Sequence, residues 1–256
     1  MSRTMLLVHG AFAGAWAWQP FRAHFEAAGW RCITPDLRHH QPGADLAALG
    51  HTGIEDYASD LAALIATLDA PPVLVGHSMG ALLCQKLAAR GLGRALILLA
   101  PAPGWGILPS SGLEVLSRFA LLQSGADFWR KAVPPRFDYA AGFALDRFPP
   151  PRQRELYGCF LPESGRALAE MLYWMFDPRQ ASAVEAHRIR QPTLCLVGRG
   201  DRVTPPDTVR AIARRLAGPV AHEEIDGHSH FLLGEPGFEM ILQRCQAWLA
   251  RLPGGG

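Results

Sequence analysis

A chain of 256 residues is long enough for one large α/β domain or two small ones. Its 49% hydrophobic and 19% charged residues predict a globular protein with an ample core and exclude a disordered chain. The formal net charge of +2 argues against nucleic acid or an anionic membrane as the main partner. No apolar run approaches the roughly 18 residues that a membrane helix needs.

In chain order, short apolar runs alternate with amphipathic runs over the first hundred residues. We expect strands at residues 4–8, 31–36, 73–77 and 95–100, most of them continuous apolar runs. We expect helices at residues 16–28, 56–68 and 81–90, and a polar loop at 37–53. Strands without polar alternation are typical of a parallel sheet covered on both faces. The pattern predicts an α/β fold with a doubly wound, mostly parallel sheet, whose ligands bind beyond the carboxyl ends of the strands.

This alternation stops between residues 103 and 190. The segment is rich in proline, has helical runs at 112–122 and 167–176, and holds 13 of the 23 Phe, Trp and Tyr residues. It lacks any clear strand pattern. We interpret it as a helical cap domain (103–190) inserted into an α/β core of residues 1–102 and 191–256. A cap rich in aromatic residues offers an apolar ceiling to a site beneath it.

The strand and helix pattern resumes after residue 190. We expect strands at residues 192–198 and 220–225, and helices at 206–216 and 238–252. A glycine-containing loop, 226–230, precedes the last helix. The tail, 253–256, is expected to be disordered.

Five cysteines are scattered over the chain: Cys32, Cys84, Cys159, Cys195 and Cys245. This scatter predicts free thiols in a reducing compartment, and neither a disulfide framework nor a metal site. The first residues have no signal-peptide layout. We therefore expect a cytoplasmic protein.

The central strand runs into Gly76-His77-Ser78-Met79-Gly80, a Gly-x-Ser-x-Gly pattern that a helical run follows at once. Strand, sharp turn, serine and helix form the layout of a nucleophile elbow. Gly76 and Gly80 leave room for the strand and the helix to pass closely. The Ser78 hydroxyl is expected at the positive end of a helix, where negative charge is favoured. Ser78 is therefore the candidate nucleophile.

A serine nucleophile needs a base within hydrogen-bond reach and a third group that orients this base. Asp201 follows the end of an apolar strand and is the candidate for the orienting acid; the alternative is a helix N-cap. His228 and His230 both lie in the last loop between a strand and a helix. We favour His230 as the base, because it lies further beyond the strand end and directly before Phe231. His228 stays open as the alternative.

Four further histidines lie near strand ends and are candidates by residue type alone. We expect His9 and His77 to be locked into glycine turns that they hold together. His39 and His40 follow Asp36 in what we expect to be an ordinary solvated loop. We assign none of the four a catalytic role.

The oxyanion of a tetrahedral intermediate must be met by preorganised donors. The backbone amide of Met79, directly after the serine, is the first candidate. The second is expected from the turn after the first strand, where Ala11 follows a His-Gly pair; the amide of Phe12 is the alternative. The Phe12 side chain could instead wall the acyl pocket. We also expect Trp105 to line the substrate pocket.

Four motifs resemble the signatures of the α/β-hydrolase superfamily, in the order that the superfamily has them: residues 9–11, 76–80, 198–201 and 225–231. They bracket nearly the whole chain outside residues 103–190. The front end, residues 9–18, is similar to the branch that holds plant methyl-ester esterases and hydroxynitrile lyases. The resemblance implies cofactor-free hydrolysis through an acyl-enzyme, with Ser78 as nucleophile, His230 as base and Asp201 as orienting acid.

The chain departs from related families at several positions. The lyase branch places a lysine directly after its base, whereas Phe231 follows His230 here, so cyanohydrin cleavage is disfavoured. A serine instead of an aspartate at position 78 argues against dehalogenase and epoxide hydrolase chemistry. Residues 37–42 replace a glycine-rich turn that is common in the superfamily, which leaves the conformation of this loop open.

We therefore predict a serine esterase that cleaves small to medium carboxylic esters, as a monomer or a homodimer without nucleic acid or membrane partners. A lactonase, a thioesterase or a carbon–carbon bond hydrolase on the same triad are alternatives. A non-catalytic small-molecule receptor of the same fold is another. A peptidase would need an acidic site for a substrate amine. Four residues could supply it, although ordinary surface charge also explains them: Glu155, Glu163, Glu170 and Asp177.

Overall fold

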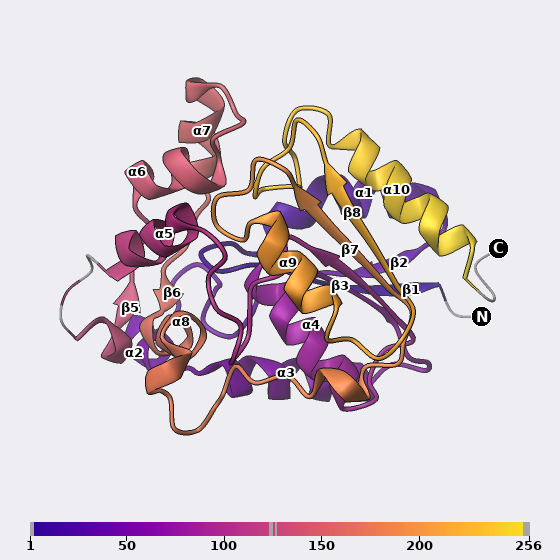
Figure 1. Cartoon of the computed structure of the whole chain (residues 1–256), viewed down its shortest axis with the longest axis horizontal. Helices are drawn as coiled ribbons and strands as arrows, with labels where there is room; N and C mark the ends of the chain where they lie inside the picture. Colours follow the sequence, from indigo (N-terminus) through magenta and orange to yellow (C-terminus); the bar gives the residue numbers. More distant parts are fainter. Residues whose placement is uncertain (1–2, 123–124, 126, 253–256) are drawn as a thin grey trace.

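A six-stranded parallel sheet forms the centre of the computed structural model, which describes residues 3–122, 125 and 127–252 (Figure 1). The strand order is β2-β1-β3-β4-β7-β8, and neighbouring strands pair in parallel throughout. The chain first runs from β1 to the edge at β2 and then returns past β1 to build the other half. This order confirms the doubly wound α/β class. The strands are β1 Thr4–Val8, β2 Arg31–Ile33, β3 Val73–His77, β4 Ala95–Leu99, β7 Thr193–Gly198 and β8 Val220–Ile225.

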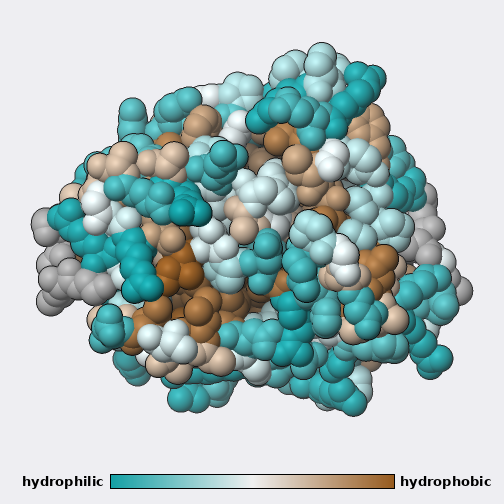
Figure 2. All heavy atoms as spheres, turned by 180° about the vertical axis from the view of Figure 1, so that it is seen from behind, coloured by the Kyte–Doolittle hydropathy of each residue, from teal (hydrophilic) through white to brown (hydrophobic). Residues whose placement is uncertain are grey.

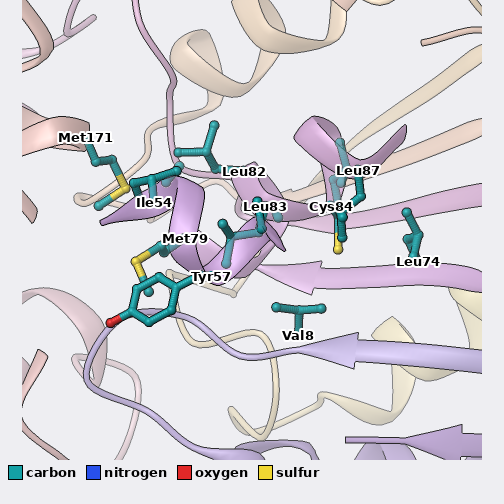
Figure 3. Close-up of a cluster of buried hydrophobic side chains, with 14 of the residues drawn as sticks. Val8, Ile54, Tyr57, Leu74, Met79, Leu82, Leu83, Cys84, Leu87 and Met171 are labelled. Atoms are coloured by element: carbon teal, nitrogen blue, oxygen red, sulfur yellow. The ribbon is translucent and has the colours of Figure 1, made fainter. Parts of the chain in front are cut away.

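Helices cover both faces of the sheet. Alternate residues of each strand point to opposite sides, and apolar side chains on both sides need to be buried. Val8 and Leu74 pack with side chains of the helices on one face, as Figure 3 shows for α3 and α4. Met5 and Leu7 pack on the opposite face. The first face carries α3 Ile54–Ala66, α4 Met79–Ala89 and α9 Pro206–Ala213. The second carries α1 Gln19–Ala27 and α10 Glu239–Ala250.

The expected elements of the core are present, with shorter bounds at several ends. The run expected as one helix at 16–28 begins as a 3₁₀ turn, Ala15–Trp18, before α1. The loop expected at 37–53 contains a short helix, α2 Leu46–Gly50. The Asp45 side chain starts α2 by accepting hydrogen bonds from the amides of Ala47 (2.9 Å) and Ala48 (3.1 Å). A helix of five residues is too short for its apolar spacing to show in the sequence.

The segment between residues 103 and 190, called the insertion below, lies between β4 and β7 in the chain. In Figure 1 it is on the left, on the side toward which the strands run. Its helices are α5 Gly112–Leu122, α6 Phe137–Tyr139, α7 Pro150–Tyr157 and α8 Gly165–Leu172. Shorter turns are Phe128–Arg130, Ala140–Ala144, Trp174–Phe176 and Ala186–Arg188.

Contrary to the sequence expectation, the insertion also contains strands. β5 (Ala132–Val133) pairs antiparallel with β6 (Glu163–Ser164), in a register that joins Val133 to Glu163. Two residues are too few to produce an alternating pattern, so the sequence gives no sign of them. This small ribbon anchors the insertion beside α2.

Hydrophilic residues cover most of the rear face of the molecule, and the hydrophobic residues seen there form separate patches (Figure 2). No helix in the described part of the chain is long and apolar enough to cross a bilayer. All five cysteines are free, with Cys159 exposed and Cys32 half-buried. The expectation for the tail at 253–256 falls outside the described residues.

Candidate active site

Ser78 lies at the sharp turn between β3 and α4. Its backbone has φ 51° and ψ −118°. This left-handed region costs a non-glycine residue about 1–3 kcal/mol, so surrounding structure must enforce it. The Ser78 amide donates to the Leu99 carbonyl oxygen (3.0 Å). The Ser78 carbonyl oxygen accepts from the amides of Ala81 and Ala102 (3.0 Å each), which ties the turn to α4 and to the end of β4.

Two glycines make this turn sterically possible. A Cβ atom at Gly76 would lie 2.5 Å from the carbonyl oxygen of Gly80. A Cβ atom at Gly80 would overlap the carbonyl oxygens of Val8 and His9. These neighbours are backbone atoms inside a packed sheet, which cannot move aside cheaply. The close passage of strand and helix expected from the sequence is therefore confirmed.

His230 lies between Ser78 and Asp201 and contacts both. Its Nε2 atom is 3.2 Å from Ser78 Oγ, and its Nδ1 atom is 2.9 Å from Asp201 Oδ2. Since a carboxylate only accepts, Nδ1 carries the proton when the ring is neutral, and Nε2 is left as an acceptor for the serine proton. The arrangement can therefore remove a proton from the Ser78 hydroxyl.

The Asp201 carboxylate is held by its own loop. Oδ1 accepts from the amides of Val203 (2.8 Å) and Thr204 (2.9 Å), and the Thr204 hydroxyl lies 3.0 Å from Oδ2. The Thr204 hydroxyl is also 3.1 Å from the Ala100 carbonyl oxygen, where β4 ends. These contacts fix the carboxylate toward His230. Thr204 was not expected from the sequence, although its spacing of three residues from Asp201 is typical of such side-chain turns.

His228 is turned away from Ser78 and faces a different acid. Its Nδ1 atom is 3.3 Å from Glu235 Oε2, which also accepts from the Ser229 amide at 2.7 Å. His228 and Glu235 are both buried. Glu235 therefore holds the loop that carries His230. The sequence did not predict this role. Of the two histidines left open, the geometry favours His230 as the base.

His77 and His9 lie in the turns where they were expected, and both stay neutral at ordinary pH. Burial and the neighbouring His230 lower the pKa of His77 to about 3, and its Nε2–H donates to the His230 carbonyl oxygen (2.9 Å). Burial also lowers the pKa of His9 to about 4. Its Nε2 atom accepts from the Leu37 amide (3.0 Å). Both rings hold neighbouring loops and neither touches the Ser78 hydroxyl.

The backbone amides of Ala11 and Met79 are the candidate oxyanion donors. The turn that carries Ala11 lies against the serine, since a Cβ atom at Gly10 would be 3.1 Å from Ser78 Cβ. None of the hydrogen bonds found within residues 3–122, 125 and 127–252 uses either amide. The Phe12 amide, by contrast, donates to Glu163 Oε2 (3.3 Å). Of the two alternatives in this turn, the geometry favours Ala11.

Ser78 and His230 border a cavity with an empty volume of about 1000 Å³, part of it open to solvent. Its wall is mostly apolar, and the insertion contributes Phe160, Leu168 and Met171. Phe12 lines it, as expected. No three His, Cys, Asp or Glu side chains of the described residues are grouped so that they could hold a metal ion.

Trp105 lies outside this cavity, so the expectation for Trp105 is wrong. Its amide donates to the Ser182 carbonyl oxygen (3.1 Å), and its ring packs 5.4 Å from that of Trp174. The side chain lines a separate small hollow beside Gln85. The hydrogen bond between Trp105 and Ser182 joins the two ends of the insertion. No local sequence pattern indicates this contact between distant residues.

A family model described as "Alpha/beta hydrolase family" matches residues 5–240. The chain belongs to this family. A 2-hydroxy-6-oxo-2,4-heptadienoate hydrolase of Pseudomonas putida is 29% identical over 234 residues, covering 80% of this chain and 74% of that protein. A pyrethroid hydrolase of Sphingobium wenxiniae is 26% identical over 227 residues, covering 85% and 78%. The methylesterase MES16 from Arabidopsis has a similar fold, with a TM-score of 0.70, 16% identity and coverage of 97% and 99%.

This alpha/beta hydrolase has a buried polar cluster behind the turn of Ala11 and Phe12, which the sequence did not indicate. Glu163, on β6 of the insertion, is fully buried and accepts from Tyr57 Oη (2.8 Å) and His40 Nε2 (3.1 Å), besides the Phe12 amide. His40 Nδ1 lies 3.1 Å from the Arg38 carbonyl oxygen. The expectation that His40 lies in a solvated loop is therefore wrong. The interpretation of Glu163 as ordinary surface charge is wrong as well, because both side chains are buried.

The two nitrogens of His40 both face acceptors, which favours the imidazolium form. Burial opposes this charge, but the carboxylate of Glu163 outweighs it and raises the pKa of His40. Burial likewise opposes the charge of Glu163, but His40 and the donors around the carboxylate lower its pKa. The cluster is a buried ion pair that joins the insertion to the turn of Phe12.

We expect Glu163→Gln to destabilise the protein most between about pH 5 and 6. The raised pKa of His40 stabilises the fold fully below its ordinary value of 6.5, and this contribution is lost as the pH rises through the folded-state pKa. The lowered pKa of Glu163 stabilises above its ordinary value of 4.5 and is lost on acidification. Breaking such a pair costs about 3 kcal/mol. Urea unfolding at pH 5.5 and pH 9 measures the difference.

The matched control is Glu155→Gln, whose side chain is exposed on α7 and forms an ion pair with Arg152. Its free energy of unfolding should stay within about 0.5 kcal/mol of the parent at both pH values. Equal destabilisation of Glu163→Gln at pH 5.5 and pH 9 would contradict the ion pair.

Proposed function

We propose that this alpha/beta hydrolase is a serine carboxylesterase for small to medium esters with apolar acyl or aromatic parts. One observation carries the proposal: the hydrogen-bonded series from Ser78 Oγ through His230 to Asp201, at 3.2 and 2.9 Å. The series borders a mostly apolar cavity. It needs no cofactor, because all proton transfers pass through the side chains themselves.

In the acylation step, Ser78 Oγ attacks the ester carbonyl carbon while His230 Nε2 takes its proton. The imidazolium that forms is stabilised by Asp201, and the oxyanion by the amides of Ala11 and Met79. The tetrahedral intermediate then collapses. The C–O bond to the alcohol breaks, and His230 returns the proton to the leaving alkoxide. Water repeats the sequence on the acyl-enzyme, releasing the acid and restoring the Ser78 hydroxyl.

The insertion supports the choice of substrate. Phe160, Leu168 and Met171 of the insertion line the cavity that Ser78 borders, so we assign residues 103–190 the role of a cap domain over Ser78. The apolar wall favours acyl chains or aromatic rings. The free cysteines favour a reducing compartment, and we propose a cytoplasmic enzyme, monomeric or dimeric.

The second candidate function is hydrolysis of a carbon–carbon bond next to a carbonyl group. It is favoured by the 29% identity to the 2-hydroxy-6-oxo-2,4-heptadienoate hydrolase, whose name describes such a keto acid as substrate. The same triad would serve both reactions. Measuring turnover of 4-nitrophenyl esters against that of vinylogous keto acids separates the two. Faster turnover of the keto acid would replace the ester assignment.

Covalent labelling tests the nucleophile directly. With an ethyl 4-nitrophenyl alkylphosphonate, we expect Ser78 Oγ to bond to phosphorus and 4-nitrophenolate to leave. Intact mass should rise by one adduct, and peptide mapping should place the adduct on Ser78. Activity should fall in proportion to labelling. Equal labelling of the Ser78→Ala protein would reject the assignment.

A further inference from the structure

The charged residues that line the Ser78 cavity are of one sign. Arg118 and Arg136 line it, and no Asp or Glu is found among the lining residues that the structure describes. Asp138, the partner of Arg136, lies outside the lining and is exposed. A cleft whose wall carries only cationic side chains concentrates anions. The remaining wall is mostly apolar, so it offers an anion few other polar groups to bind.

Arg118 is built into this wall. It belongs to α5, and its side chain is only 9% exposed. Nη2 donates to Glu114 Oε1 at 2.5 Å. Within the described chain this is the only nitrogen of the guanidinium that makes a hydrogen bond to a side chain. A guanidinium has five N–H donors in a planar fork, so this bond leaves donors for a second group.

Glu114 positions Arg118 but does not face the cavity. It is fully buried, and its Oε2 atom accepts from the Ser110 amide and the Thr208 hydroxyl, each at 2.7 Å. The carboxylate is therefore anchored between α5 and α9, behind the wall. Ser117 and Tyr139 extend the polar part of the wall beside Arg118.

We propose that Arg118 forms a carboxylate subsite, so that the substrates are esters bearing a free carboxylate away from the scissile bond. The inference rests on the esterase function proposed above. A fixed guanidinium binds the two oxygens of a carboxylate through parallel N–H donors, and burial from water strengthens this contact. The apolar wall then takes the carbon chain between the carboxylate and the ester.

Two matched pairs of esters test the subsite. The first is mono-4-nitrophenyl adipate against 4-nitrophenyl hexanoate, which differ at the end of the acyl chain. The second is 3-carboxyphenyl butanoate against phenyl butanoate, which differ on the alcohol side. We expect kcat/KM of the carboxylate ester to exceed that of its partner about tenfold or more in at least one pair. The rate with Ser78→Ala protein is subtracted as background.

The matching variant is Arg118→Gln in a Glu114→Gln background, which leaves no buried charge without a partner. It should lose the preference for the carboxylate ester by about tenfold to hundredfold, measured as the ratio of kcat/KM for the two esters of a pair, in which any loss common to both esters cancels. Arg152→Gln, an exposed arginine of α7, is the control and should keep the preference. Arg118→Lys, which keeps the charge but loses the fork, should show a smaller loss.

Two measurements on unaltered Arg118 keep the test independent of variant folding. The preference should fall as sodium chloride is raised, because salt screens the attraction. The Ser78→Ala protein should bind the adipate ester about tenfold more tightly than the hexanoate ester. No preference in either pair, or a preference that survives loss of Arg118, would overturn the subsite. Absent turnover of all four esters would instead overturn the proposed esterase function.

Discussion

Ser78→Ala is expected to lower kcat/KM for 4-nitrophenyl butyrate about a thousandfold or more. Without Oγ no acyl-enzyme forms, and His230 at 3.2 Å has no proton to take from the residue. The oxyanion donors and the cavity remain, so a small residual rate over water is expected. The fold should be unchanged, because the hydroxyl borders a cavity and fills no packed space.

The control is Ser59→Ala, an exposed serine on α3. Its kcat/KM should stay within about twofold of the parent, since the side chain lies far from the reacting atoms. Thermal unfolding of both variants separates loss of chemistry from loss of fold. Activity of Ser78→Ala within tenfold of the parent would remove Ser78 from the mechanism.

The sheet could be predicted because its four central strands, β1, β3, β4 and β7, are buried on both faces. Residues 4–8, a continuous run of buried residues, match β1 at both ends, and residues 220–225 match β8 at both ends. The strand expected at 31–36 proved shorter, β2 Arg31–Ile33: its pairing with β1 ends at Ile33, and Pro35 has no amide that could extend the ladder. The helix α2 and the ribbon of β5 and β6 escaped prediction, since elements of two to five residues carry no periodicity.

The residues of the triad could be identified because each follows the end of an expected strand. A parallel sheet brings the carboxyl ends of its strands to one edge. Ser78, Asp201 and His230 could be named for this reason, and they lie in contact. Glu163 could not, because it reaches the Phe12 amide from the insertion, 151 positions along the chain. Such a contact depends on how the insertion packs, which no local pattern records.

Arg118 illustrates the same limit for specificity. In the sequence it is one arginine on an expected helix, with an acid four positions before it, which reads as an ordinary helix-surface pair. In the structure Glu114 is buried, and Arg118 lines the cavity of Ser78. Local sequence motifs thus predict the residues of the triad, whereas the choice of substrate depends on contacts between distant elements.

The two histidines of the last loop should respond differently to replacement by alanine. His230→Ala removes the group between Ser78 Oγ and Asp201 Oδ2, and we expect kcat to fall about a thousandfold or more. His228→Ala removes the 3.3 Å contact to Glu235 Oε2 and leaves the contacts of His230 with Ser78 and Asp201 in place. It should keep kcat within about fivefold and lower the free energy of unfolding by about 1 kcal/mol.

Stopped assays with 4-nitrophenyl butyrate and urea unfolding of both variants measure the two effects. The opposite order of kcat losses would make His228 the base and would require the loop to rearrange. Phosphonate labelling adds a readout that folding alone would not change. His230→Ala should label at Ser78 far more slowly than His228→Ala, because the serine then lacks the acceptor for its proton. Equal labelling rates would mean that neither ring activates Ser78, and the proposed proton transfer would be wrong.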